Sequence, residues 1–140
     1  MRDYPKPSVT VDAVVFDKDW NILLIKRKFD PFKDCWALPG GFVNPGEDLE
    51  LACQRELQEE TNVLLIFDKI AGAYGVAGRD PRGWTISVAY VAYDQNFGRF
   101  DIKAKDDAAL VEIFSYDSIK ILPLAFDHRE IITEARRLYY

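Results

Sequence analysis

The sequence predicts an α/β (α+β) domain in which helices cover a mixed β-sheet. Three observations support this fold class. Segments rich in β-branched residues occupy positions 8–17 and 22–26, and such residues favour strands. A helical segment with acidic residues in its first turn follows at 45–61. Further strand-like segments precede a second helix, and strands interrupted by well-separated helices are typical of a helix-covered sheet.

The expected strands are separated by recognisable turns. Positions 18–21 have the composition of a turn, so the strands at 8–17 and 22–26 are expected to pair as a hairpin. Two more strands are expected at 70–76 and 85–93. The rest of the second half is expected to contain a polar loop at 77–83, an irregular charged stretch at 94–109 and a short strand at 110–114.

The two expected helices carry capping signals. Before the helix at 45–61, Asn44 and Glu47 fit a capping pattern. After it, Asn62 suits the left-handed residue that ends many helices. The last helix is expected to begin near Asp127, and its apolar residues recur at helical spacing at Ile131, Ile132, Ala135 and Leu138.

Composition and charge exclude several classes of protein. The 140 residues suit one domain spanning 1–140, and a hydrophobic content of 49% argues against disorder. The net charge of −5 comes without a basic patch of the kind that binds nucleic acid. No apolar run suits a membrane span or a secretory signal. Cys35 and Cys53 lack metal-site spacing, so we expect free thiols in a cytoplasmic protein that binds neither nucleic acid nor membranes.

An acidic face on the first helix points to a divalent cation. At about 100° per residue, Glu56, Glu59 and Glu60 fall within an arc of about 100°. Like charges this close repel unless a cation neutralises them, and Mg²⁺ and Mn²⁺ prefer carboxylate oxygens. Most acidic helix faces are simply solvated. Here the nearby Gly40-Gly41 pair permits close approach of the backbone to a ligand, and Arg55 can orient a carboxylate.

The segment 41–63 resembles the Nudix box of the Nudix hydrolase family. That pattern reads Gly, five residues, Glu, seven residues, Arg-Glu, an aliphatic residue, any residue, Glu-Glu, any residue, Gly and an aliphatic residue. Every defined position matches except that Asn62 stands where the family has Gly, and Asn tolerates the left-handed conformation next best. The resemblance extends over most of the chain and implies a Nudix-type α/β/α sandwich with a mixed sheet.

The resemblance also implies roles for the residues of this segment. The implied ligands of Mg²⁺ or Mn²⁺ are the Gly40 carbonyl, Glu56, Glu59 and Glu60. Arg55 would orient a carboxylate, and Glu47 would either support the loop before the helix or bind metal through water. The implied reaction is attack of a metal-activated water on one phosphorus of a diphosphate, with a carboxylate accepting the proton.

An acidic residue outside the Nudix box is expected to serve as metal ligand or general base. Asp106 and Asp107 precede the last expected strand, and Asp107 is taken as the catalytic candidate. Glu112 is an alternative. Family members often have a Glu and a Trp near this point, where this chain has Leu110 and Ile113, so the identity of the base stays open.

Looser matches resemble the ADP-ribose pyrophosphatase branch of the family. They lie at positions 4–12, 36–43, 79–83 and 124–128. The implied reaction is hydrolysis of ADP-ribose, a nucleoside diphosphate linked to another moiety, to AMP and ribose 5-phosphate. Arg79 and Arg82 are candidates to grip phosphate or ribose oxygens, and an ordinary solvated loop is the competing interpretation.

Aromatic side chains supply candidates for stacking on the adenine. Phe32 is taken as the substrate-binding candidate, and Phe29, Phe42 and Tyr74 are alternatives, although packing is the commoner role for any one aromatic residue. His128 is the only histidine of the chain. Because it lies early in a helix, we expect it to be a structural residue with satisfied hydrogen bonds.

Other functions compete with this one. A Nudix pyrophosphatase could instead cleanse oxidised nucleoside triphosphates. A non-catalytic domain could bind or sense ADP-ribose, as in Nudix-related transcriptional regulators that carry a winged helix after the Nudix-like domain. The chain ends at Tyr140 with no room for such a domain, and its acidic set is complete, so an enzyme is expected. The resemblance also suggests a homodimer.

Overall fold

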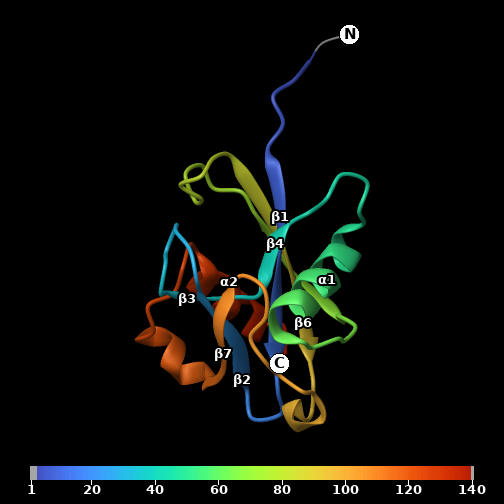
Figure 1. The fold of residues 1–140 in the computed structure, drawn as a ribbon, viewed down its shortest axis with the longest axis vertical. Coiled ribbons are helices and arrows are strands. Elements are labelled where there is room, and N and C mark those ends of the chain that lie inside the picture. The colour runs from blue at the N-terminus through green and yellow to red at the C-terminus, as the bar shows by residue number, and fades with distance from the viewer. Residues whose placement is uncertain (1–2, 140) are drawn as a thin grey trace.

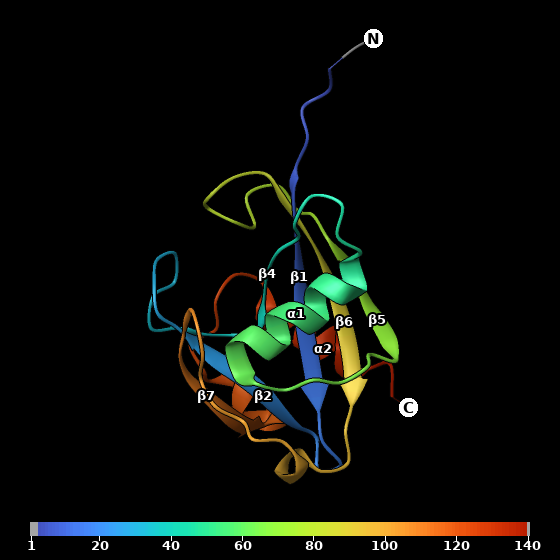
Figure 2. The ribbon, with the colours of Figure 1, turned by 45° about the vertical axis from the view of Figure 1, so that its right-hand side comes forward.

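The computed structural model describes residues 3–139, which form a seven-stranded mixed sheet with an α-helix on each face (Figures 1 and 2). The strands are β1 (Ser8–Phe16), β2 (Asn21–Arg27), β3 (Trp36–Ala37), β4 (Gly40–Phe42), β5 (Lys69–Tyr74), β6 (Thr85–Tyr93) and β7 (Ala108–Ser115). The helices are α1 (Leu49–Thr61), α2 (His128–Arg136) and the short 3₁₀ helices η1 (Phe97–Arg99) and η2 (Tyr116–Lys120). The predicted α+β class is confirmed. Met1, Arg2 and Tyr140, the ends of the predicted 1–140 domain, lie outside the described residues.

Alternation along β1 divides the core between the two layers. Val11 packs in the cluster that contains Leu57 of α1. Val14 packs on the opposite face, in the cluster that contains Ile131 and Ile132 of α2. All five side chains are fully buried, so each helix is held to the sheet by its own apolar contact. No helix within residues 3–139 is long and apolar enough to cross a membrane.

The strands β1 and β2 separate soon after the turn that joins them. β1 pairs in parallel with β6 along its whole length, but it pairs with β2 only at Phe16 and Ile22. β2 then pairs with β7, and β4 takes the place beside β1 (Figure 1). The predicted hairpin is therefore confirmed only at its turn. Because β2 leaves β1, β4 can bring Gly40 directly opposite Asp12.

Helix α1 begins at Leu49, so the predicted start at position 45 was wrong. Gly46 has a φ of +79°, which a right-handed helix cannot contain. The preceding residues form a turn instead, in which the Glu47 carboxylate accepts the Asn44 N–H at 3.1 Å. The predicted pairing of these two residues therefore exists, but it stabilises a turn before the helix, whose N-cap is Asp48.

The end of α1 agrees with the sequence. Asn62 adopts the left-handed conformation, with φ 65° and ψ 18°. Its side-chain amide donates to the Asp101 carbonyl oxygen at 2.8 Å and its oxygen accepts from Lys105 Nζ at 3.4 Å. Asn62 therefore ends the helix, as a glycine could, and also ties it to the segment before β7, which a glycine could not.

Other boundaries shift by a few residues. β5 spans 69–74 rather than 70–76, and β7 spans 108–115 rather than 110–114. Asp127 is the N-cap of α2, as predicted, but the helix ends at Arg136 and excludes Leu138. The sequence did not predict β3 and β4. These elements begin and end where a neighbouring strand supplies hydrogen bonds, and local sequence does not record that neighbour.

Leu57→Ala is expected to lower the free energy of unfolding by about 2–5 kcal/mol, because Leu57 is fully buried between α1 and the sheet. Leu51 lies on the same helix and is 56% exposed, so Leu51→Ala should change that free energy by less than about 0.5 kcal/mol. Urea denaturation followed by circular dichroism measures both. Equal effects would show that α1 does not pack through Leu57.

Candidate active site

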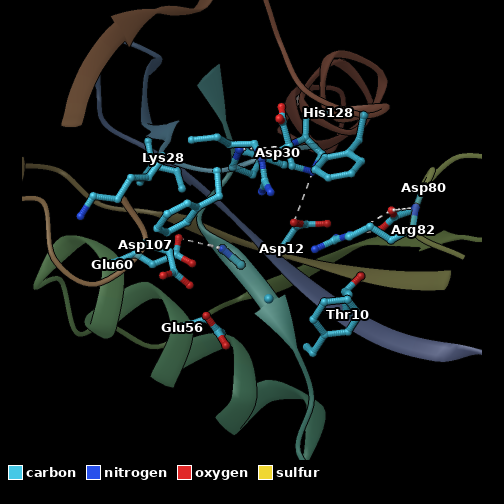
Figure 3. Close-up of a pocket in the computed structure, with 18 of the residues that line it drawn as sticks. Thr10, Asp12, Lys28, Asp30, Glu56, Glu60, Asp80, Arg82, Asp107 and His128 are labelled. Atoms are coloured by element: carbon cyan, nitrogen blue, oxygen red, sulfur yellow. Dashed lines mark hydrogen bonds and ion pairs between the residues drawn. The ribbon is translucent and has the colours of Figure 1, made fainter. Parts of the chain in front are cut away.

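A cleft of about 430 Å³ lies beside β1 and β4, and one wall of it is formed by α1 (Figure 3). Segments from the whole chain contribute ionisable side chains to its lining. They are Asp12, Arg27, Lys28, Asp30, Glu56, Glu60, Arg79, Asp80, Arg82, Asp107 and His128. Among the predicted residues, Gly40, Glu56, Glu60, Arg79, Arg82 and Asp107 line the cleft, whereas Arg55, Glu59 and Phe32 lie outside its lining.

Glu56 and Glu60 lie on the face of α1 that meets the backbone of β4. The Gly40 N–H donates to Glu60 Oε2 at 3.3 Å. A Cβ at Gly41 would lie only 2.6 Å from the carboxyl carbon of Glu56, so any larger residue would displace this carboxyl group. Gly41 therefore leaves room for the Glu56 carboxylate against β4, and Gly40 lets β4 lie close against β1.

The two carboxyl groups are electrostatically unusual. Glu60 is 6% exposed, and burial raises its pKa well above the usual range, with the charge of Glu56 adding to the shift. Burial also raises the pKa of Glu56, although Arg55 acts in the opposite direction. A buried carboxylate beside a second, half-buried one is stabilised when a proton or a cation lies between them. Their hard oxygen donors fit Mg²⁺ or Mn²⁺.

Arg55 connects the turn before α1 with the acidic face of the helix. Its guanidinium donates to both oxygens of Glu47, at 2.7 and 3.0 Å. It also donates to Glu56 at 2.9 Å and to Glu59 at 3.2 Å. Charge-assisted bonds of this kind fix carboxylate orientation. Arg55 thus stands where it can orient Glu56, and Glu47 supports the geometry of the loop and helix.

The predicted acidic triad is only partly assembled. Glu56 and Glu60 both line the cleft, but Glu59 turns to Arg55 and its side chain is 44% exposed. Within residues 3–139, no group of three or more His, Cys, Asp or Glu side chains is arranged to hold a metal ion. The structure therefore brings two of the three predicted carboxylates together.

Asp107 is the acidic candidate outside the Nudix box that reaches the cleft. It directly precedes β7 and lines the cleft together with Glu60 (Figure 3). Asp106 has a φ of +52° and is absent from the cleft lining. Glu112 is exposed on β7 and is likewise absent from it. Position alone therefore favours Asp107 over the other two.

The two predicted arginines have different surroundings. The Arg79 side chain is 5% exposed and binds both oxygens of Asp127, at 2.8 and 2.6 Å. Arg82 is 38% exposed, pairs with Asp80 at 2.8 Å and lies over the Phe42 ring, 4.7 Å from its centroid. Both guanidinium groups bind both oxygens of an aspartate, but Arg82 is much more exposed than Arg79 and is therefore the better placed of the two for a ligand.

The aromatic candidates also divide. Phe29 and Phe42 line the cleft and are 59% and 43% exposed. The predicted residue Phe32 is outside the lining, because its ring packs on Phe126 with the centroids 4.8 Å apart. Tyr74 donates a hydrogen bond to a carboxylate of α2 and lies outside the cleft lining.

The sequence did not predict several residues of the cleft lining. Thr10 and Asp12 are polar residues at alternate positions of an apolar strand, a detectable sign that this face of β1 lines a site. Arg27 also lines the cleft, where its Nε donates to the Pro31 carbonyl oxygen at 2.7 Å. Nothing in the sequence distinguishes Arg27 from the lysines on either side of it.

His128 is buried and structural, as the sequence predicted. It is 4% exposed, and burial lowers the pKa of its imidazole. Its Nδ1 accepts the Leu38 N–H at 3.0 Å, and its Nε2 lies 3.4 Å from Asp12 Oδ1. The sequence did not predict that these contacts would place it in the lining of the cleft.

Comparison with known protein families identifies the family to which the chain belongs. The NUDIX domain model matches residues 6–135. The chain belongs to the Nudix family. This Nudix chain is 45% identical over 136 residues to the ADP-ribose pyrophosphatase of Methanocaldococcus jannaschii, an alignment that covers 97% of the chain and 77% of that relative. It is 38% identical to the ADPR responsive transcriptional repressor NtrR of Acinetobacter baylyi, over 95% of the chain and 54% of the repressor.

Solved Nudix structures share the fold. The NUDIX domain of Shewanella oneidensis NrtR, crystallised with ADP ribose, is 31% identical with a TM-score of 0.88, covering 98% of this chain and 91% of that one. A bifunctional NMN adenylyltransferase/ADP ribose pyrophosphatase of Francisella tularensis, complexed with AMP and a Mn ion, is 36% identical with a TM-score of 0.87. This chain is covered to 98%, but it spans only 43% of that protein. The prediction of a Nudix hydrolase with an α/β/α sandwich is confirmed.

Glu60→Gln is expected to stabilise the metal-free protein at neutral pH. Because the pKa of Glu60 is raised in the folded state, wild-type stability should fall as the pH rises from the ordinary glutamate pKa of about 4.3 through the raised one. Glutamine does not titrate, so this loss should disappear. Chemical denaturation in chelator over this pH range measures it, with the exposed first-turn residue Glu50 changed to Gln as control. A Glu60→Gln variant less stable than wild type at neutral pH would contradict the expectation.

Proposed function

We propose that this Nudix protein hydrolyses the diphosphate linkage of ADP-ribose to give AMP and ribose 5-phosphate, using Mg²⁺ or Mn²⁺. The observation that carries the proposal is the pair of the half-buried Glu56 and the buried Glu60, which lies beside Gly40 and Gly41 in a cleft that also contains a partly exposed arginine. The substrate is supported by the 45% identical ADP-ribose pyrophosphatase and by the related NUDIX domain crystallised with ADP ribose.

Glu56, Glu60 and the Gly40 carbonyl are the proposed metal ligands, and Glu59 is the third carboxylate. The bond between Glu59 and Arg55 is partly exposed, and exposed ion pairs contribute at most about 1 kcal/mol. Glu59 can therefore leave Arg55 at little cost. A divalent cation held there would lower the pKa of a bound water and neutralise charge on the diphosphate. The Mn ion of the Francisella tularensis structure is consistent with this donor set.

The remaining side chains of the cleft have complementary roles in the proposal. Asp107 accepts the proton of the attacking water, since it lines the cleft together with Glu60. Arg82 and Arg27 offset the negative charge of the substrate on the side of the cleft that contains Phe126, because both guanidinium groups lie over that ring. Arg79 and Phe32, the substrate-binding candidates of the sequence, are proposed here to stabilise the walls of the cleft, because both make contacts within the protein.

A second candidate function is an ADP-ribose sensor that does not turn the ligand over. The 38% identity to the repressor NtrR over 95% of the chain favours it. The complete set of carboxylates in the Nudix box favours the enzyme, because a binding module needs no neighbouring pair of acidic groups at the ligand. A nucleoside triphosphate-cleansing pyrophosphatase would use the same metal site with a different specificity.

The proposal extends to assembly and location. We propose one Nudix domain that acts as a homodimer in the cytoplasm and binds no nucleic acid. The edge strand β7 exposes Leu110 and Ile113 on opposite faces of the sheet, at 47% and 43%, and an exposed edge strand can pair with a second copy. Both Cys35 and Cys53 are free thiols, which agrees with a reducing compartment.

The substrate is tested by product analysis on a panel of ADP-ribose, NADH, a diadenosine polyphosphate, and ordinary and oxidised nucleoside triphosphates. Each is incubated with magnesium, with manganese and with chelator. Release of AMP and ribose 5-phosphate, chiefly from ADP-ribose and only with metal, is the expected result. Turnover of triphosphates alone would overturn the specificity. Binding of ADP-ribose without any turnover would instead establish the sensor.

Glu60→Gln is expected to lower the turnover of ADP-ribose by more than about 100-fold, since even residues that only orient metal ligands contribute about 10–100-fold. The fold should persist, because the substitution keeps the shape of the side chain. Steady-state kinetics at saturating metal measures the effect. Glu50→Gln, on the exposed first turn of α1, should keep wild-type turnover. Near-normal activity of Glu60→Gln would rule out this carboxylate as a metal ligand.

A further inference from the structure

A buried chain of polar contacts runs beneath the cleft, from β6 through β1 and α2 to the backbone before β4. The Ser87 hydroxyl donates to Asp12 Oδ2. Asp12 Oδ1 lies 3.4 Å from His128 Nε2, and His128 Nδ1 accepts the Leu38 N–H at 3.0 Å. Exposure is 0% for Ser87, 6% for Asp12, 4% for His128 and 2% for Leu38. Figure 3 shows Asp12 between β1 and the imidazole.

The direction of each contact in this chain is fixed. His128 Nδ1 accepts from a backbone amide, so in the neutral ring the proton must lie on Nε2, where it faces Asp12. His128 Nδ1 and Asp12 Oδ2 then accept hydrogen bonds, and His128 Nε2 and Asp12 Oδ1 face each other at 3.4 Å. No buried side-chain nitrogen or oxygen within residues 3–139 lacks a hydrogen-bond partner. One side-chain arrangement therefore satisfies the whole chain.

The chain touches the Gly40 segment at two points. Leu38 lies two positions before Gly40, and its N–H is held by His128. Asp12 lies opposite Gly40 in the pairing of β1 with β4. A Cβ at Gly40 would lie 2.7 Å from Asp12 Oδ1, so the Asp12 carboxylate is packed against the Gly40 backbone. The contacts from both sides restrict how this backbone can move.

His128 is itself held firmly, so it can act as a fixed point. The residue before it, Asp127, binds Arg79 through two bonds of 2.8 and 2.6 Å. The segment before α2 also exchanges backbone hydrogen bonds with Trp36, whose N–H donates to Pro123 and whose carbonyl accepts from Ala125, both at 2.8 Å. The start of α2 and the Leu38 backbone are therefore joined as one unit.

Polarity on this face of β1 is confined to the part that meets β4. Further along the same face, Val14 and Phe16 are fully buried in the apolar cluster under α2. Well-packed apolar residues are often at least as stabilising as buried charged groups. Packing alone therefore does not account for Asp12 and His128, and their contact with the Gly40 segment does.

We propose that Ser87, Asp12 and His128 are positioning residues that hold the Leu38–Gly40 backbone, and with it the Gly40 carbonyl, in place for metal binding beside Glu60. This inference rests on the proposed metal site. Groups that orient the ligands of a metal typically contribute about 10–100-fold in metal affinity. These three side chains act through the backbone and do not themselves contact the metal.

The test is the affinity of the full chain for Mn²⁺ alone, measured by electron paramagnetic resonance of the free ion, with thermal unfolding recorded for every variant. His128→Leu removes both ring contacts and should weaken Mn²⁺ binding by about 10–100-fold. His128→Asn retains an acceptor for the Leu38 N–H and should recover part of that loss. Ile132→Val changes a fully buried residue of the same helix that takes no part in these polar contacts. It should lower thermal stability and keep wild-type affinity.

Wild-type Mn²⁺ affinity in folded His128→Leu would overturn the inference, as would an equal loss of affinity in Ile132→Val. If His128→Leu does not fold, Ser87→Ala decides, because it removes only the hydroxyl farthest along the chain; a several-fold weakening is expected, and unchanged affinity overturns the inference.

Asp12 supplies a separate check. Asp12→Asn keeps the shape of the side chain and one acceptor, and the Ser87 hydroxyl can turn to accept from the new amide. It should therefore retain much more affinity than Asp12→Ala, whereas equal losses would mean that the Asp12 charge acts directly on the metal. A wild-type chain that binds no Mn²⁺, or a Glu60→Gln variant that binds it normally, would defeat the proposed metal site itself. If Glu60→Gln weakens Mn²⁺ binding but His128→Leu does not, only the positioning role is overturned.

Discussion

The site depends on the contact between the glycines of β4 and the acidic face of α1. A Cβ at Gly41 would lie 2.6 Å from the carboxyl carbon of Glu56. Only glycine therefore lets the Glu56 carboxyl group occupy its present position. That approach buries Glu60 against the Gly40 N–H and creates an electrostatic cost that a proton or a divalent cation can relieve. Stability and function therefore oppose each other at this point, as they often do where a protein prepares a charged site.

The cleft contains both acidic and cationic side chains. Glu56, Glu60 and Asp107 line it together with Arg27 and Arg82, whose guanidinium groups lie over the Phe126 ring. A diphosphate needs both, because metal ions neutralise the oxygens at the reacting phosphorus and guanidinium groups offset the remaining charge. The chain as a whole carries a net charge of −5, so the local arrangement of charges, not their sum, suits the cleft to an anionic ligand.

Agreement between sequence and structure depended on whether the signal was local. The end of α1 at Asn62 was predictable, since a left-handed residue after a helix is a backbone preference. The start was not predictable in the same way. Gly46 has a φ of +79°, so the helix begins after it, and the Glu47 carboxylate accepts hydrogen bonds from Arg55 and from the turn. The pairing of β1 with β2 was overestimated because β4 pairs with β1 in place of β2. β4 is distant from β1 in the sequence, so the residues of β1 carry no local signal of this pairing.

By itself, the sequence determined the family and the α+β sandwich through the resemblance of 41–63 to the Nudix box, and helical spacing placed three acids on one helix face. Only the tertiary structure decided which of those acids meet, since Glu59 turns to Arg55 while Glu60 is buried at Gly40. It also decided that Arg79 is occupied and that Asp12, Ser87 and His128 are linked. These last contacts join residues that are 48 to 116 positions apart, a separation that only the pairing of β1 with β6 and the packing of the sheet against α2 can close.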